Sequence, residues 1–250
     1  MKKPSARRRI TALLLSLLPL AAAHATESDE FDRPETLSTW KILDQDKASG
    51  IDIDSSRKGH LTLQIKDLND NGWYMNGRGV FVFKEIQGNF AAETKLRVGR
   101  ISDAGQWPRG LFNSAGFVVR DPASTSGKEN WIMVNIGYQY AGLGRETKTT
   151  RNSHSELNLI DIPTTANTGK LLICRVGNIF RMYHWLAHET DWVAEDTPRE
   201  FKRDDFPATV QVGLTINAYE TPRETLAEFD YVRFSKPISF DDCLSNASKE

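Results

Sequence analysis

The sequence has 250 residues, of which 32 are lysine or arginine and 33 are aspartate or glutamate. Removing residues 1–25 would take away five basic residues and no acid, which leaves 27 basic against 33 acidic residues and a net charge near −6. Nucleic acids and anionic membranes both require concentrated positive charge, so we expect neither as a partner.

The first 25 residues have the pattern of a secretory signal. Basic residues precede an apolar stretch at 10–23, and the spacing Ala23-His24-Ala25 suits a signal peptidase. The stretch is interrupted by Thr11, Ser16 and Pro19 and is shorter than the roughly 20 residues that a membrane-spanning helix needs. We therefore expect cleavage after Ala25 and a periplasmic or secreted protein; an uncleaved anchor is the alternative. The run "ARRRIT" also resembles a twin-arginine signal, so the export route stays open.

After the signal, apolar and polar residues alternate with a period of two, and convincing helical periodicity is absent. We expect about ten strands, in segments 61–66, 79–85, 89–98, 115–140, 169–185, 208–217 and 225–235. Irregular rim segments are expected at 99–113, 121–129, 142–152 and 188–206. Many short strands with turn residues between them predict an all-β, two-sheet antiparallel sandwich over residues 26–236, followed by a C-terminal tail, 237–250.

The chain has two cysteines, Cys174 and Cys243. In an oxidising compartment they can pair, and the bond would then fasten the tail to a strand. The alternative is a buried thiol at Cys174 and a reactive one in the tail. No CxxC motif or Cys/His metal spacing is present.

Several segments in order carry a resemblance: "GVFVFKEIQGNFAAETKLRV", "SAGFVVRDP", "ENWIMVNIG", "KLLICRVGNIFRMYHW" and "VQVGLTINAY" leading to "AEFDYVRFS". They are similar to the concanavalin A-like lectin/glucanase superfamily, most of all to small jelly-roll modules also appended to β-xylosidases. The resemblance covers about Phe31 to Ser235 and implies a jelly-roll sandwich whose concave face usually holds the sugar. It implies functions that range from sugar binding to glycoside hydrolysis, polysaccharide cleavage or scaffolding.

The alternation also predicts a ligand-binding face. If Phe117 and Val119 point into the core, the opposite face collects polar and aromatic side chains. Sugars need flat apolar surfaces for their C–H faces and planar donors and acceptors for their hydroxyl groups. The predicted carbohydrate-binding residues are Arg120, Trp131, Asn135, Gln139, Gln211, Thr215, Asn217 and Tyr219. The alternative is that Trp131 packs under a loop and Arg120 caps a sheet edge. Trp73 and Trp107 are expected to be exposed and to extend an aromatic platform.

The second hypothesis is that the protein is an enzyme, either a glycoside hydrolase or a polysaccharide lyase. A hydrolase normally needs two carboxyl groups about 5–10 Å apart, but the Glu-x-Asp-x-x-Glu motif of the related glucanases is absent, and Asp52 with Asp54 is a weak substitute. A lyase base and cation could be drawn from Arg120, Arg175, Tyr183 and His184. A zinc pair of His184 and His188 is expected only if the chain turns between them. A third hypothesis is a structural or protein-interaction module of the cell envelope.

No cofactor is required by any of these readings. The resemblance suggests one metal, a structural calcium ion that ties the first strand to the last. Asp230 in "FDYVRF" matches the family's aspartate, and Glu30 and Asp32 lie near the other end. The alternative for Asp230 is a hydrogen-bonded turn acid.

Overall fold

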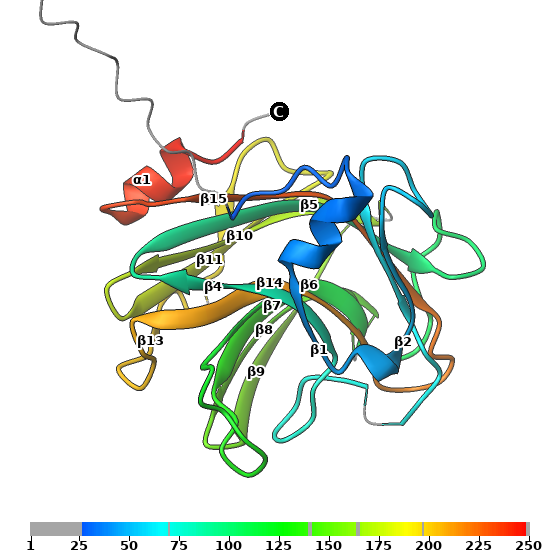
Figure 1. Ribbon diagram of the computed structural model, residues 1–250, viewed down its shortest axis with the longest axis horizontal. Helices are drawn as coiled ribbons and strands as arrows, with labels where there is room; N and C mark the ends of the chain where they lie inside the picture. The colour runs from blue at the N-terminus through cyan, green and yellow to red at the C-terminus, as the bar shows by residue number, and fades with distance from the viewer. Residues whose placement is uncertain (1–26, 70, 140–141, 164–165, 197, 249–250) are drawn as a thin grey trace, which may run out of the picture.

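The computed structural model describes residues 27–69, 71–139, 142–163, 166–196 and 198–248. Within these residues the chain forms two antiparallel sheets that lie face to face (Figure 1). The predicted two-sheet antiparallel sandwich is therefore confirmed. The expected signal, residues 1–25, lies outside the described part of the chain.

The first sheet has the strand order β1-β4-β14-β6-β7-β8-β9 and the second has the order β12-β11-β10-β5-β15-β3-β2, with β13 beside β11. The strands of the first sheet are β1 (Lys41–Leu43), β4 (Val80–Gln87), β6 (Asn113–Arg120), β7 (Trp131–Gln139), β8 (Gly142–Arg151), β9 (His154–Asp161) and β14 (Thr209–Ala218). Those of the second are β2 (Ala48–Ile53), β3 (Leu61–Ile65), β5 (Phe90–Arg100), β10 (Thr168–Val176), β11 (Ile179–Leu186), β12 (Val193–Ala194), β13 (Phe201–Lys202) and β15 (Thr225–Ser235).

The inner faces of the two sheets make the core. Phe117 of β6 is opposite Leu214 of β14 on one side and Val134 of β7 on the other, and all three side chains are fully buried. Burying a side chain of this size contributes about 1.5–3 kcal/mol. Phe117 and its neighbours therefore point into the core, as predicted from the alternation. The residues between them occupy the outer face of the first sheet.

One segment predicted to be irregular, 142–152, is instead strand β8. The segment reads "GLGRETKTTRN" and shows no apolar alternation, because both faces of β8 carry polar side chains. Its strand conformation depends on backbone pairing with β7 and β9 on either side. Period-two hydrophobicity cannot detect such a strand.

The C-terminal segment is fastened to the second sheet. A short helix, α1 (Phe240–Ser245), begins after Ser239, whose side chain accepts a hydrogen bond from the Asp242 backbone nitrogen in a capping box. The helix lies against the outer face of this sheet (Figure 1), and a disulfide joins Cys174 of β10 to Cys243. The pairing left open by the sequence is therefore settled in favour of the disulfide. Two further short helices, η1 (Pro34–Thr39) and η2 (Gln45–Lys47), flank β1.

Candidate functional site

The outer face of the first sheet carries all eight predicted binding residues. Strand register aligns them in rows across β14, β6 and β7: Gln211 with Arg120 and Trp131, Thr215 with Gly116 and Asn135, and Asn217 with Ser114 and Gly137. Gln139 continues β7, and Tyr219 follows β14 on the same face. Whether these residues bind a ligand depends on which of them remain accessible.

The segment 71–78, here called loop 71–78, crosses this outer face. It begins beside β14, where the Ala218 nitrogen donates to the Asn71 carbonyl at 2.8 Å, and reaches β9, where the Met75 nitrogen donates to Ser155 Oγ at 2.7 Å. Trp73 of this loop packs edge-on against Trp131, with ring centroids 5.4 Å apart. Trp131 is fully buried as a result. The expectation that Trp73 and Trp107 are exposed is wrong, since both are buried.

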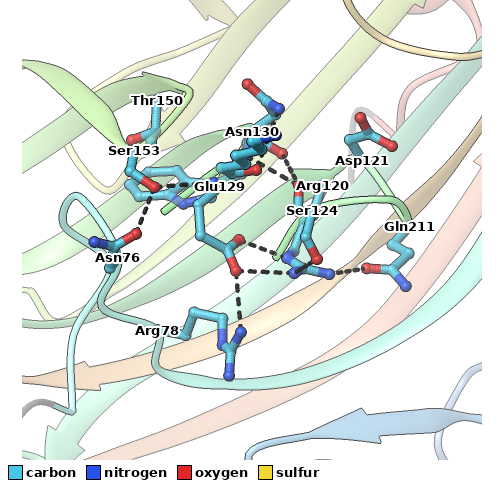
Figure 2. A network of polar contacts seen from close by, with 12 residues as sticks. Asn76, Arg78, Arg120, Asp121, Ser124, Glu129, Asn130, Thr150, Ser153 and Gln211 are labelled. Atoms are coloured by element: carbon cyan, nitrogen blue, oxygen red, sulfur yellow. Dashed lines mark hydrogen bonds and ion pairs between the residues drawn. The ribbon is translucent and has the colours of Figure 1, made fainter. Parts of the chain in front are cut away.

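Arg120 is committed to an internal ionic network (Figure 2). Its Nε and Nη2 atoms donate to the two carboxylate oxygens of Glu129 at 2.9 and 3.0 Å, and its Nη1 donates to Gln211 at 3.0 Å. Arg78 of loop 71–78 donates to the same carboxylate at 3.0 Å and also to Asp44, and hydrogen bonding to Asp44 raises the pKa of Arg78. Both Arg120 and Glu129 are buried. Arg120 is therefore bonded inside the protein instead of facing the outside, and Arg78 ties loop 71–78 to the same carboxylate.

Beside loop 71–78, the outer face keeps an open pocket of about 340 Å³. Its mouth is formed by half-exposed side chains, Tyr74 at 49 % and Tyr219 at 50 %, whereas Glu146, Lys148 and Asn217 are buried at its base. The lining residues are Gly72, Trp73, Tyr74, Phe112, Glu146, Lys148, Leu157, Asn217 and Tyr219. Aromatic and apolar walls over a few polar groups are typical of small-molecule sites.

The two charged residues of the base neutralise one another. Lys148 Nζ lies 2.6 Å from Glu146 Oε1 and donates to the Trp73 carbonyl at 2.7 Å. The same ammonium group lies 5.7 Å from the centre of the Tyr74 ring and 6.0 Å from that of Phe112. Lys148 thus holds loop 71–78 and both aromatic walls around one buried ion pair.

Next to the ion pair lies a cluster of amides, here called the amide cluster, made of Ser114, Asn135 and Asn217. Asn135 and Asn217 donate from Nδ2 to Ser114 Oγ at 3.2 and 3.1 Å, and neither amide oxygen has a hydrogen-bond partner among the described residues. Because Ser114 has one hydroxyl hydrogen, it can satisfy at most one of these oxygens whichever way the amides are turned. A buried acceptor without a partner costs about 1–3 kcal/mol. Asn217 is the member of the cluster that also lines the pocket, so its oxygen is the acceptor placed nearest to a ligand.

The amide oxygens of this cluster lie over glycine residues and occupy the space that a side chain at those positions would need. A Cβ atom added to Gly116 would lie 2.7 Å from the Asn135 amide oxygen, and one added to Gly79 would lie 2.7 Å from the Asn217 amide oxygen. Gln139, farther along β7, is also buried, with neither side-chain polar atom partnered in the part of the chain that the structure describes. Gln139 does not belong to the lining of the pocket.

The residues considered for a lyase do not meet. Arg175 donates to the carbonyls of Pro207 and Ala208, and Tyr183 packs in the apolar cluster around the disulfide. His184, on the opposite face of β11, contacts Arg145 and Glu195 between the sheets. With Arg120 in its own network, the predicted combination is wrong, because alternate residues of a strand point to opposite faces.

The chain does turn between His184 and His188, and both ring Nε2 atoms approach Glu189 Oε1, at 2.9 and 3.6 Å. The described residues nevertheless contain no group of three or more His, Cys, Asp or Glu side chains arranged to hold a metal ion. The contacts of His184 with two carboxylates and an arginine are those of a buried ionic cluster.

Asp230 lies 3.3 Å from Lys95 Nζ and 3.9 Å from His60 Nε2. Glu30 forms an ion pair with Arg233 at 2.8 Å instead of turning toward Asp230. One carboxylate beside two basic groups is not a set of ligands that suits calcium, which prefers six to eight oxygens. These side chains do not fit the ion, and calcium binding stays a prediction that these contacts do not support.

Comparison with proteins of known structure identifies the fold. No family model matches the sequence, and no characterised protein matches it in sequence. A xylan beta-1,4-xylosidase from Bacillus halodurans matches the structure over 92% of this chain and 42% of its own, with 18% identity and a TM-score of 0.63. A winged bean acidic lectin matches over 83% of this chain and 97% of its own, with 15% identity and a TM-score of 0.55. The chain has a concanavalin A-like jelly-roll fold.

A third similar structure, that of a functionally unknown protein from Saccharomyces cerevisiae, matches over 81% of this chain and 99% of its own, with 16% identity and a TM-score of 0.60. The chain spans about two fifths of the length of the xylosidase. At these identities the likeness establishes the concanavalin A-like fold and nothing finer. The helices of the described part are all too short or too polar to cross a bilayer.

The sequence analysis did not identify all the residues of this pocket. The alternation of β14 predicts Asn217 and Tyr219, and Trp73 was expected to extend the aromatic platform, but the pair of Glu146 and Lys148 was not predicted. The spacing of these two charges in "RETKT" places both on one strand face, which is the one signal that could have indicated them. It becomes visible only when the segment is known to be a strand.

Proposed function

We propose that this protein is an exported carbohydrate-binding protein that holds a neutral sugar in the pocket between loop 71–78 and Tyr219. The observation that carries the proposal is the combination, at one site, of aromatic walls with the buried amide of Asn217, whose oxygen has no hydrogen-bond partner among the described residues. A pyranose ring presents an apolar C–H face to aromatic rings and hydroxyl donors to amide oxygens, so it satisfies both kinds of surface at once. The eight residues predicted from the alternation divide accordingly. Asn217 and Tyr219 contact the ligand, while Arg120 and Trp131 support the wall.

The charge of the pocket supports a neutral ligand. Glu146 and Lys148 pair with each other at 2.6 Å, so the base presents no uncompensated charge. A uronate carboxylate would have to displace Glu146 from Lys148, and breaking a buried ion pair costs several kcal/mol, of the order of 3–5. Neutral hexoses and pentoses are therefore the favoured class.

Binding is supported over hydrolysis. A retaining or inverting glycosidase normally uses two carboxyl groups on either side of the scissile bond. Glu146 is the single acidic residue among those that line the pocket, and its carboxylate is engaged by Lys148. The floor of the pocket can therefore hydrogen-bond to the hydroxyl groups of a sugar. Its described lining residues do not supply the second carboxyl group that acid–base catalysis would use.

The proposal is tested by calorimetric titration of the chain from Thr26 onwards with methyl α-D-galactoside and with xylobiose, with and without calcium. Galactose is chosen because the similar winged bean lectin was crystallised with methyl-alpha-D-galactose, and xylose because a similar protein is a xylosidase. Tyr219→Ala should weaken binding about tenfold, which corresponds to about 1.4 kcal/mol. Ile238→Ala, at an 86% exposed apolar side chain away from the pocket, is the control and should change nothing.

Absence of binding across a wider glycan array, or equal affinity of the Tyr219 and Ile238 variants, would overturn the proposal. Release of reducing ends from any polysaccharide of the panel would replace it with the hydrolase hypothesis. Export is tested separately by the mass of the protein recovered from the periplasm or medium, which should correspond to cleavage after Ala25.

A further inference from the structure

We infer that the pocket recognises the end of a glycan, its terminal one or two sugars, and not the interior of a polysaccharide chain. This inference rests on the proposed carbohydrate-binding function and narrows its ligand class. A chain bound through its interior needs a groove with two exits, so the question is whether the outer face of the first sheet provides them.

Loop 71–78 closes one side of the pocket over the width of the central strands. Its hydrogen bonds to Ala218 on β14 and Ser155 on β9 fix where it begins to cross and where it arrives. Between these points, Trp73 Nε1 donates to Thr215 Oγ1 at 2.7 Å and the Trp73 carbonyl accepts from Lys148 at 2.7 Å. These anchors join the loop to three strands of the sheet, β14, β8 and β9, so a bound glycan cannot continue along the sheet beneath it.

The loop is also held from its far end. Arg78 bonds to Asp44 and Glu129, and the Asn76 amide oxygen accepts from the Gly127 nitrogen at 2.7 Å. Behind the loop, the outer face is filled by Trp131, Phe81 and their neighbours in one apolar cluster. No continuation of the pocket therefore exists on that side in the described part of the chain.

A second wall, which adjoins the start of loop 71–78, is made of aromatic rings. Phe112, just before β6, contacts Tyr219, just after β14, with ring centroids 6.2 Å apart in an edge-on arrangement. Gly72 completes the corner, because a Cβ atom placed there would lie 3.7 Å from Tyr219 Cβ. The half-exposed residues Tyr74, Leu157 and Tyr219 mark the mouth, which opens away from the sheet.

The size of the pocket agrees with this geometry. Its volume of about 340 Å³ lies at the lower end of the range of ligand pockets, about 300–1,000 Å³. A sugar that enters through the mouth places its outermost ring on Asn217 and the ion pair, and the rest of the glycan leaves through the same opening. Each chain end is then one binding site, whatever the length of the chain.

The test uses two ladders of oligosaccharides, of β-1,4-linked xylose and of galactose, from the monosaccharide to the hexasaccharide, and linear xylan and galactan in a short and a long preparation. We expect affinity to rise by no more than about twofold beyond the disaccharide, and the number of protein molecules bound per polymer chain to be the same for both lengths. Tyr219→Ala should weaken binding to the monosaccharide and to the polymer by the same factor, since both use the same pocket.

Stoichiometry that grows with polymer length, or affinity that climbs steadily to the hexasaccharide, would overturn the inference while carbohydrate binding stood. A Tyr219→Ala effect that fades as the ligand lengthens would overturn it in the same way, because it would reveal contacts outside the pocket. Failure of every sugar to bind would overturn the proposed function and this inference together. The two failures are therefore distinguishable.

Discussion

Replacing Glu129 with glutamine should be among the most destabilising single changes on the outer face of the first sheet. The Glu129 carboxylate is buried and receives three arginine N–H groups, two from Arg120 and one from Arg78, at 2.9–3.0 Å. Removing one partner of a buried ion pair leaves the other charge uncompensated and costs about 3–5 kcal/mol. For a domain of this size, this corresponds to a fall in melting temperature of roughly 6–20 °C.

The measurement is the free energy of unfolding in urea, with Glu85→Gln as the matched control. Glu85 also forms an ion pair, at 2.8 Å with Lys41, but the two side chains are 43% and 62% exposed, so the control should lose about 0–1 kcal/mol. Removing both charges, in an Arg120→Met, Glu129→Leu double variant, should recover much of the loss, because an apolar replacement no longer buries a charge. Equal losses for the Glu129 and Glu85 variants would refute the view that this network holds loop 71–78 in place.

Three further outcomes can be checked by the same urea titrations. The hydrogen bond from Arg109 lowers the pKa of Glu224 below its usual 4.5, so the ion pair stabilises the fold at higher pH and this stabilisation is lost as the pH falls through the folded-state pKa. Glu224→Gln should therefore lose less stability than the parent protein between about pH 6 and pH 3. Parallel plots of unfolding free energy against pH for the two proteins would contradict this. Replacing Cys174 and Cys243 together by alanine should cost about 4 kcal/mol, the chain-entropy value for a separation of 69 residues, and an unchanged midpoint would show that the bond does not act on the unfolded chain. Gly116→Ala should destabilise by about 1–3 kcal/mol, because its Cβ atom would lie 2.1 Å from a backbone carbonyl of β7; a neutral effect would mean that β6 and β7 can separate freely.

The sequence predicts which side chains of each strand point into the core and which point outward. Phe117 and Val119 turn inward, and Arg120 turns outward, because side chains on a strand alternate strictly between its two faces. Once apolar residues are assigned to the core, the residues of the outer face follow, and the eight predicted binding residues do lie on one face of the first sheet. The two-sheet sandwich follows from the same local alternation.

Strand β8 marks the limit of that reasoning. Glu146 and Lys148 lie in a run of polar residues that has no apolar period, so the sequence alone predicts an irregular segment. The strand exists because its backbone pairs with β7 and β9, and those partners are chosen by the whole sheet. Two charged residues of the pocket base were hidden for this reason.

What only the tertiary structure decided is which outer-face residues are covered. Trp73 meets Thr215 across 142 positions of the chain, and Arg78 meets Glu129 across 51. Local alternation carries no information about such distant pairs, because it records only which face a side chain takes and not what later packs upon it. The path of loop 71–78 buries Trp131 and Arg120 and leaves Asn217 and Tyr219 at an open pocket. The sequence by itself determined the two faces of the sheet; long-range packing decided where one of them remains open to a ligand.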